Sequence, residues 1–173
     1  MKILKTIITA FFLAFVASGC EREDLHYPDP SPSPSDSIYE EPYTPKEAGE
    51  ALVFASRLNG SWHGSLKSRY INDYGVTVSG EYTTEMSFSQ YETKAVNGNG
   101  TESDYEDGKR VWQMAFTWFV ENSASGSTSL RMKRADGYEL VSKMCRFAGD
   151  TLKMELVSTD GLETNNYVLT SSK

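Results

Sequence analysis

Residues 61–173 contain no proline and consist of short segments in which apolar and polar residues alternate. Alternation with a period of two is typical of strands that bury one face. Pairs such as Asp107-Gly108 and Asp136-Gly137 separate the segments, and these residue types tolerate the positive φ angles of tight hairpin turns. The pattern predicts eight strands, at residues 61–70, 76–90, 92–104, 109–121, 127–134, 137–147, 150–158 and 164–171.

Two of the predicted strands are irregular. Asn97-Gly98-Asn99-Gly100 reads either as a turn or as a bulge near the third strand. In the sixth strand, Leu140 and Met144 share one parity, whereas Cys145 and Phe147 share the other. Apolar residues on both faces indicate either a bulge within this strand or a helix that covers its outer face.

Eight short antiparallel strands joined by hairpins favour an all-β, up-and-down barrel, because closure removes the exposed edges of a flat sheet. One short helix is expected before the barrel. Thr44 fits an N-cap, Pro45 fits the first helical position and Glu47 completes a capping box. Apolar residues at three- and four-residue spacing then run to Leu58, and Asn59-Gly60 ends the pattern. We expect this helix to cover one end of the barrel.

The first twenty residues read as a targeting segment. Lys2 and Lys5 precede an apolar stretch over residues 7–17, which is shorter than the ~20 residues that a membrane-spanning helix needs. Val16-Ala17-Ser18-Gly19-Cys20 resembles the lipobox of bacterial lipoproteins, with Ala17 where leucine is commonest. The resemblance implies cleavage before Cys20 and attachment of acyl chains such as palmitate to it. Two or three chains, at about 0.8 kcal/mol per buried methylene, hold a protein on a membrane.

A proline-rich segment follows the cysteine. Glu21-Arg22-Glu23-Asp24 resembles the export signal of Bacteroidota lipoproteins bound for the outer face of the outer membrane, and it reads equally well as a solvated charge run. All six prolines lie between Pro28 and Pro45, a composition typical of a disordered tether. We therefore expect a lipid-anchored outer-membrane protein, on either face of that membrane or at the cell surface. The predicted parts are a signal peptide, residues 1–19; a lipidated tether, residues 20–44; and a helix-plus-barrel domain, residues 45–173.

Charge and cysteine content exclude several classes of function. Removing residues 1–19 removes two lysines and no acidic residue, which changes the net charge from −7 to −9. Such an acidic chain is not drawn to nucleic acid by charge. Once Cys20 carries lipid, Cys145 is the one remaining cysteine, so no intramolecular disulfide can form. We expect a monomer without a cofactor, attached to the membrane through Cys20.

Leu58-Asn59-Gly60-Ser61-Trp62 resembles the Gly-x-Trp opening of the lipocalins, in which the tryptophan plugs the closed end of the barrel. The order of a capped helix, this strand, the aromatic strand Phe116–Val120 and the later hairpin Leu140–Leu156 is similar to that of the lipocalin-like lipoproteins of Bacteroidota. That group is mostly of unknown function, and the resemblance covers residues 45–173. It implies a barrel with Gly60 and Trp62 as its structural plug. It implies no ligand, since residues 163–172 lack the basic residue that lipocalins place against that tryptophan.

Aromatic side chains on the inward parity are the candidate ligand-facing residues. Large flat side chains inside a barrel can hold an apolar or sugar-like small molecule. The alternative is that the same residues, with Met86, Met114, Met132 and Met154, fill the barrel. The candidates are Trp112, Phe116, Trp118, Tyr82, Phe88 and Tyr167.

No residue pattern indicates catalysis or metal binding. His26 falls in the tether and His63 on the outward face of a strand, so no histidine cluster forms. Cys145 reads as a small buried hydrophobe rather than a reactive thiol. The acidic residues at 102–107, like those at 160–163, read as solvated hairpin turns rather than calcium loops.

The sequence therefore favours a non-enzymatic, lipid-anchored envelope protein whose barrel binds a small apolar or sugar-like ligand or an envelope partner. Two alternatives stay open. One is a structural or protein-interaction module with a filled barrel. The other is an enzyme or enzyme inhibitor that acts at the barrel mouth, which carboxylates converging in a cleft would support.

Overall fold

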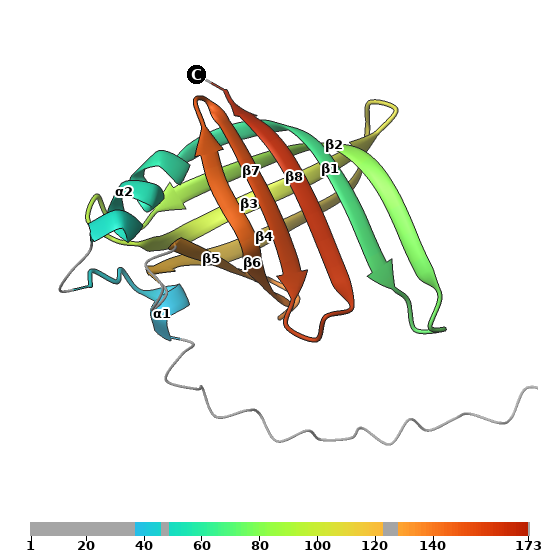
Figure 1. Cartoon of the computed structure of the whole chain (residues 1–173), viewed down its shortest axis with the longest axis horizontal. Helices are drawn as coiled ribbons and strands as arrows, with labels where there is room; N and C mark the ends of the chain where they lie inside the picture. Colours follow the sequence, from blue (N-terminus) through green and yellow to red (C-terminus); the bar gives the residue numbers. More distant parts are fainter. Residues whose placement is uncertain (1–36, 46–48, 123–127, 173) are drawn as a thin grey trace, which may run out of the picture. The chain divides into compact units, whose positions relative to one another are not determined.

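The computed structural model describes residues 37–45, 49–122 and 128–172, which form a closed antiparallel barrel with two short helices (Figure 1). The eight strands follow one another around the barrel in chain order, and the last pairs with the first. The predicted fold class is confirmed. The strands are β1 (Gly60–Ile71), β2 (Thr77–Gln90), β3 (Asn97–Glu106), β4 (Lys109–Asn122), β5 (Thr128–Arg134), β6 (Glu139–Ala148), β7 (Thr151–Ser158) and β8 (Glu163–Ser171).

The third predicted strand is wrong at its start. Residues 92–96 form a loop in which the Ala95 amide donates to the Glu92 carbonyl, and Asn97–Gly100 is neither a turn nor a bulge but the beginning of β3. The glycines make room for large rings. A Cβ atom on Gly100 would lie 2.5 Å from the ring of Phe116, and one on Gly98 would lie 2.8 Å from the ring of Trp118. Glycine here marks close packing inside a strand.

The expected irregularity of the sixth strand is a bulge. The register between β6 and β7 shifts between Ser142 and Met144. Because of this shift, Leu140 is fully buried on one side of the bulge, and Cys145 and Phe147 pack against the core on the other side.

Helix α2 (Gly49–Leu58) lies across one end of the barrel (Figure 1). The buried face of this helix carries Ala51, Ala55 and Leu58, as the apolar spacing predicts. The Trp62 indole Nε1 donates to the Leu58 carbonyl oxygen at 2.8 Å, which ties the helix to β1 at the closed end. Residues 46–48 lie outside the described residues, so the predicted capping box at Thr44, Pro45 and Glu47 stays a prediction.

The barrel domain begins earlier than predicted. Residues 37–44, assigned to the tether, include the helical turn α1 (Ser37–Glu40) and a segment that packs on β3 and β4. Tyr39 is only 4 % exposed, and its hydroxyl donates to Glu139 Oε1 at 2.7 Å. The Val96 amide donates to the Tyr43 carbonyl at 2.9 Å. Tyr39 adds apolar area to the core and the exposed Tyr43 ring lies 5.6 Å from the Phe119 ring, contacts that a purely solvated tether would not make. Residues 1–36, with the predicted signal peptide and Cys20, lie outside the described residues.

The interior is filled at the end that α2 covers. Phe88 lies 5.2 Å from Phe116 and 6.1 Å from Trp118 between ring centroids, and all three are at most 3 % exposed. Buried methionines belong to the same core cluster, and their flexible thioether side chains suit irregular cores. They are Met86, Met132 and Met154.

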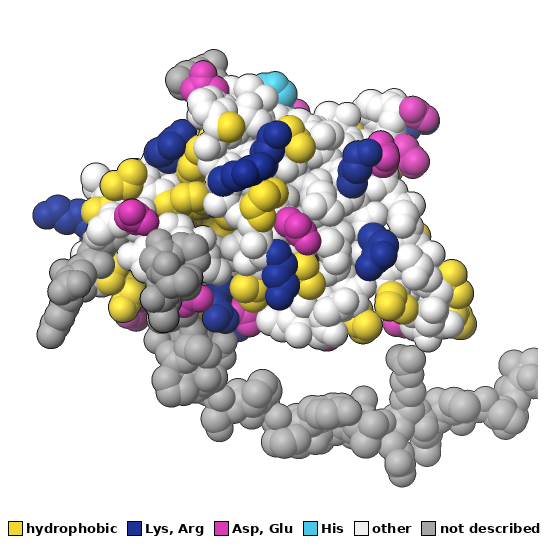
Figure 2. Space-filling view, in the orientation of Figure 1, with side chains coloured by type: hydrophobic (Ala, Val, Ile, Leu, Met, Phe, Trp, Pro, Cys, Tyr) yellow, Lys and Arg dark blue, Asp and Glu magenta, His cyan; other side chains and the backbone are white. Residues whose placement is uncertain are grey.

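The outer surface is mixed in character. On the face shown in Figure 2, basic and acidic side chains are spread over the strands and hydrophobic side chains occur in small groups. Within the described residues, no helix has the length and apolar content needed to span a membrane.

Candidate functional site

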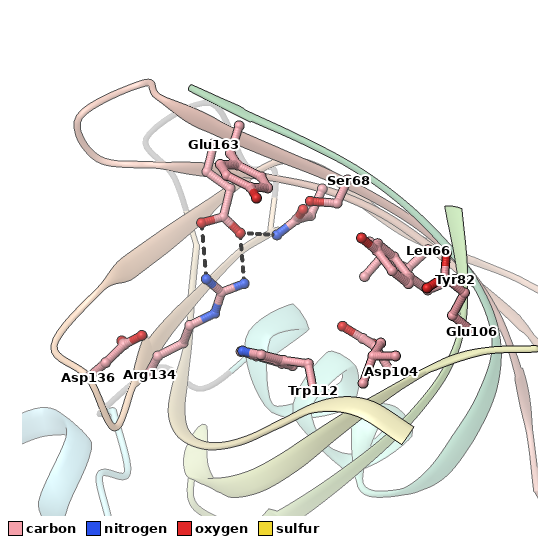
Figure 3. Close-up of a pocket in the computed structure, with 12 residues that line it drawn as sticks. Leu66, Ser68, Tyr82, Asp104, Glu106, Trp112, Arg134, Asp136 and Glu163 are labelled. Atoms are coloured by element: carbon pink, nitrogen blue, oxygen red, sulfur yellow. Dashed lines mark hydrogen bonds and ion pairs between the residues drawn. The ribbon is translucent and has the colours of Figure 1, made fainter. Parts of the chain in front are cut away.

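A cavity of about 450 Å³ opens at the end of the barrel opposite α2 (Figure 3). The hairpins that join β1 to β2, β3 to β4, β5 to β6 and β7 to β8 surround its mouth. Its walls are inward-facing side chains from six strands, and they are mostly polar or aromatic. The lining residues are Leu66, Ser68, Tyr70, Tyr82, Asp104, Glu106, Val111, Trp112, Arg134, Asp136, Glu163 and Asn165.

An ion pair forms one wall of this cavity, which we call the open-end pocket. The Arg134 guanidinium donates to both oxygens of Glu163, at 3.0 Å from Nη1 to Oε2 and 2.8 Å from Nη2 to Oε1. The side chains are 11 % and 16 % exposed, so the pair is largely shielded from water. Asn165 Nδ2 also donates to Glu163, and the Trp112 ring lies 5.0 Å from the guanidinium carbon. Both oxygens of Glu163 are therefore occupied by protein donors.

Glu102 and Tyr167 lie one inward-facing position deeper than Asp104 on β3 and Asn165 on β8. The Tyr167 hydroxyl donates to Glu102 Oε1 at 2.8 Å, and both side chains are 1 % exposed. Burial, reinforced by the negative charge of nearby Asp104, raises the pKa of Glu102 to about 7. Burial also raises the pKa of Asp104 above its usual range. Asp104 in the wall of the pocket and Glu102 behind it are thus two carboxyl groups that are costly to ionise.

Three buried acceptors around the open-end pocket have no hydrogen-bond partner within the described protein. They are Glu102 Oε2, Asp104 Oδ1 and Asn165 Oδ1, on side chains that are 1 %, 7 % and 1 % exposed. The Arg134 Nε–H group and Thr84 Oγ1 also lack a partner at full hydrogen-bond geometry, and the Thr84 hydroxyl lies opposite Asp104 across β2 and β3, where it lowers the pKa of that carboxyl. Buried polar atoms are normally hydrogen-bonded, and each exception needs an explanation. A bound molecule that donates hydrogen bonds would supply one.

The elevated pKa of Glu102 predicts an unusual dependence of stability on pH. The folded protein holds this proton up to about pH 7, whereas an unfolded chain releases it near the ordinary value of 4.5. The stabilisation is fully present below pH 4.5 and is lost as the pH rises through 7, a contribution of about 3 kcal/mol. We expect Glu102→Gln to abolish this pH dependence of the free energy of unfolding, which urea unfolding at a series of pH values measures. Glu92→Gln, in the exposed β2–β3 loop, should keep it, and an unchanged slope in Glu102→Gln would contradict the assignment.

The six aromatic candidates divide between the two halves of the barrel. Trp112 and Tyr82 line the open-end pocket. Phe88, Phe116 and Trp118 belong to the filled half, where the Phe88 ring contacts the other two. Tyr167 is fully surrounded by protein and reaches the pocket only through its bond to Glu102. Gly60 and Trp62 lie at the closed end, where the plug was expected.

The predicted solvent exposure of the pocket's polar residues is wrong. Glu102 and Asp104 were interpreted as part of a solvated hairpin, but both are buried inside the barrel. Glu163 likewise points inward, whereas its neighbour Asp160 caps the turn by accepting from the Leu162 amide at 2.9 Å. Strand parity carried the signal. Glu102 and Asp104 share their parity with Gly98 and Gly100, as Arg134 does with Leu130 and Met132, and Asn165 with Tyr167 and Leu169.

Other reactive side chains lie away from this pocket. His63 is exposed on β1 and its Nδ1 lies 2.8 Å from Ser172 Oγ. Burial raises the pKa of the Cys145 thiol to about 12, which keeps it protonated at neutral pH. In the part of the chain that the structure describes, no group of three or more histidine, cysteine, aspartate or glutamate side chains is arranged to hold a metal ion. His26 lies outside the described residues.

No protein-family model matches the chain, and no curated protein matches its sequence. Among solved structures, the chain is similar to a de novo designed fluorescence-activating β-barrel, at 14 % sequence identity and a TM-score of 0.44. The match covers 68 % of this chain and 96 % of the designed one.

Proposed function

We propose that the protein is a non-enzymatic, lipid-anchored envelope protein that binds a small polar molecule in the open-end pocket. The observation that carries the proposal is the set of buried acceptors around a cavity of about 450 Å³. A volume of several hundred cubic ångströms is typical of small-molecule sites. An eight-stranded barrel is compatible with such a role, since it can enclose one small ligand.

The buried charges argue against a barrel that serves only as a scaffold. Arg134, Glu163, Glu102 and Asp104 all lie inside a barrel whose other half is filled with apolar side chains. Apolar residues of similar volume would stabilise the fold as well or better, because burying ions is costly. Polar groups held at the end of an open cavity are therefore better explained by recognition of a ligand than by packing.

The polar lining favours a hydrogen-bond donor over a purely apolar ligand. Asp104 and Asn165 line the pocket and carry unpaired acceptors just beneath its surface, and an apolar molecule would leave these acceptors without partners. Trp112 and Tyr82 supply flat apolar faces for the rest of the molecule.

Carboxylates do converge at this mouth, which is the feature that would support an enzyme. General acid–base catalysis requires the carboxyl group to reach the reacting atom. Glu102 has the raised pKa but does not line the cavity, and both Glu163 oxygens are held by protein donors. Asp104 is thus left without a second buried carboxyl group positioned against the ligand, so binding is the better supported function.

Membrane attachment rests on the sequence around Cys20, which reads as a lipobox. We expect Cys20→Ala to move the protein from the membrane fraction to the soluble fraction, because the acyl chains would have no attachment site. Cys145→Ala is the matched control, since it removes the other cysteine and should leave the protein on the membrane. Fractionation followed by immunoblotting measures both. A Cys20→Ala protein that stays membrane-bound would refute the anchor.

Ligand binding is tested by native mass spectrometry of the full-length protein purified from its own source in detergent. We expect the wild-type chain to carry a non-protein mass that is lost on denaturation, unlike the covalently attached acyl chains. Ser68→Trp places an indole in the pocket and should abolish that mass, whereas Ser79→Trp, on the exposed face of β2, should retain it. A wild-type protein without any bound mass, or equal retention by both variants, would contradict the proposal.

A further inference from the structure

The open-end pocket is strongly negative. Four carboxylates and one guanidinium line it: Asp104, Glu106, Asp136, Glu163 and Arg134. Because Arg134 is paired with Glu163 through two hydrogen bonds, its charge is already neutralised. The other three carboxylates face the cavity and its mouth, and a concave site with charge of one sign concentrates ligands of the opposite sign.

Two of the residues that carry these buried acceptors also line the cavity. They are Asp104 and Asn165, which are 7 % and 1 % exposed, and their Oδ1 atoms lie just beneath the cavity surface. They come from β3 and β8, on two different walls. Glu102 Oε2 is a third such oxygen one position deeper on β3. A ligand group that only donates hydrogen bonds matches this set, because acceptors outnumber donors.

Aromatic rings flank the same space. Figure 3 shows Trp112 between Arg134 and Asp104 at one side of the cavity, with Tyr82 beside Asp104. The Trp112 ring already accommodates one cation, the Arg134 guanidinium, at 5.0 Å. Indole and phenol faces attract cations through their electrostatic quadrupole. Carboxylate oxygens and aromatic faces together are the surroundings that bind an organic ammonium group.

We propose that the open-end pocket binds a small organic molecule bearing an ammonium group, which pairs with the Asp104 carboxylate while the remainder packs on Trp112 and Tyr82. The assignment rests on the ligand pocket proposed above and names the class of its ligand. An ammonium has three donors and no acceptor, which suits oxygens that lack partners. An anion would face three unpaired carboxylates, and the one guanidinium is occupied by Glu163.

Two matched ligand series test this assignment by isothermal titration of the full-length protein in detergent. Tyramine, tyrosol and 4-hydroxyphenylacetate share one ring and differ in carrying an ammonium, a hydroxyl or a carboxylate. Glucosamine, glucose and gluconate repeat the comparison on a sugar frame. We expect at least one amine to bind about tenfold or more tightly than its neutral counterpart, and the anion to bind weakest. Failure of both amines to bind, or neutral members that bind as well as the amines, would overturn the assignment.

Variants locate the interaction. Asp104→Asn should weaken amine binding about tenfold and leave the neutral counterpart nearly unchanged, because only the charged partner is lost. Asp136→Asn, on the exposed rim of the same pocket, is the matched control and should have a smaller effect. Amine binding that is indifferent to Asp104→Asn would also overturn the assignment.

Proton release supplies an independent measurement. Glu102 faces Asp104 on its own strand, Arg134 on β5, and Tyr167 and Glu163 on β8, and its pKa is about 7 in the free protein. A cation in the pocket favours the ionised carboxylate, so binding of tyramine, whose amine stays protonated across this range, should release protons and tighten as the pH rises through 7. Glu102→Gln should flatten this dependence, and proton uptake in the wild type would contradict the assignment.

The two proposals can fail separately. If the mass retained by the protein from its own source belongs to a neutral or anionic molecule, the ammonium assignment falls and the ligand pocket stands. If the wild-type protein retains nothing and neither ligand series binds, both fall.

Discussion

Replacing Arg134 by alanine should lower the free energy of unfolding by about 3–5 kcal/mol at neutral pH. The guanidinium neutralises Glu163 through two hydrogen bonds, and both side chains are largely buried. Its charge also lowers the pKa values of Glu102 and Asp104 against the effect of burial. Without it, three carboxyl groups would share the interior with no counter-ion. Urea unfolding of the wild type and the variant measures the loss.

Arg131 on the same strand provides the matched control. It also pairs with a glutamate, Glu121, at 2.9 Å, but the two side chains are 38 % and 36 % exposed. Solvent screens such a pair, so Arg131→Ala should lose no more than about 1 kcal/mol. The loss in Arg134→Ala should also shrink as the pH falls, because protonation removes the unpaired negative charges. Equal losses in the two variants, or a loss in Arg134→Ala that grows on acidification, would contradict the account of the buried pair.

The second large effect is expected for Trp118→Ala, which should destabilise the protein by about 3–5 kcal/mol. The indole is completely buried in the filled half of the barrel, contacts Phe88 and donates from Nε1 to the Asn99 carbonyl at 2.9 Å. Its removal leaves a cavity and an unpaired carbonyl. Thermal or urea unfolding of the full-length protein measures the change.

Trp112→Ala is the control for this prediction, because the same residue type on the same strand lies in the open-end pocket. Its ring is partly exposed, so its removal should cost well under half of the loss in Trp118→Ala. Ligand retention should show the opposite order, with Trp112→Ala losing the ligand and Trp118→Ala keeping it wherever the variant is folded. Equal destabilisation by both would show that the interior is not divided into a filled half and a pocket.

The architecture of the barrel could be predicted because it depends on local signals. Period-two alternation, Asp-Gly and Asn-Gly turns and the absence of proline after Pro45 each act within a few residues. The exception, Asn97–Gly100, has the residues of a turn but lies in a strand. What decides its structure is the bulk of Phe116 and Trp118, which lie opposite Gly100 and Gly98 on the neighbouring strand β4 and which no local pattern reveals. The same holds for Tyr39 and Tyr43, whose proline-rich surroundings indicate a tether and whose partners lie far along the chain.

The candidate site was only half predictable, for a physical reason. Aromatic residues on inward parities were recognised, and two of them, Trp112 and Tyr82, line the pocket. Charged residues on those parities were assigned to solvent because isolated charges are seldom buried. Arg134 and Glu163 are tolerated inside because they form an ion pair. The two residues are 29 positions apart in the sequence, and their pairing depends on closure of the barrel. Only the assembled fold shows that Glu102 and Asp104 lie beside them.

The central claim is that a ligand enters the open-end pocket and leaves the filled half undisturbed. The three tryptophan indoles report on this directly, since Trp62 and Trp118 donate to carbonyls in the closed half and Trp112 lines the pocket. The measurement is the indole N–H spectrum of protein labelled at tryptophan, recorded before and after adding the low-molecular-mass extract of the cells that make it. We expect the Trp112 signal, assigned with Trp112→Phe, to shift while the other two stay in place. A spectrum without change, or a shift at Trp118 with Trp112 unmoved, would contradict the account.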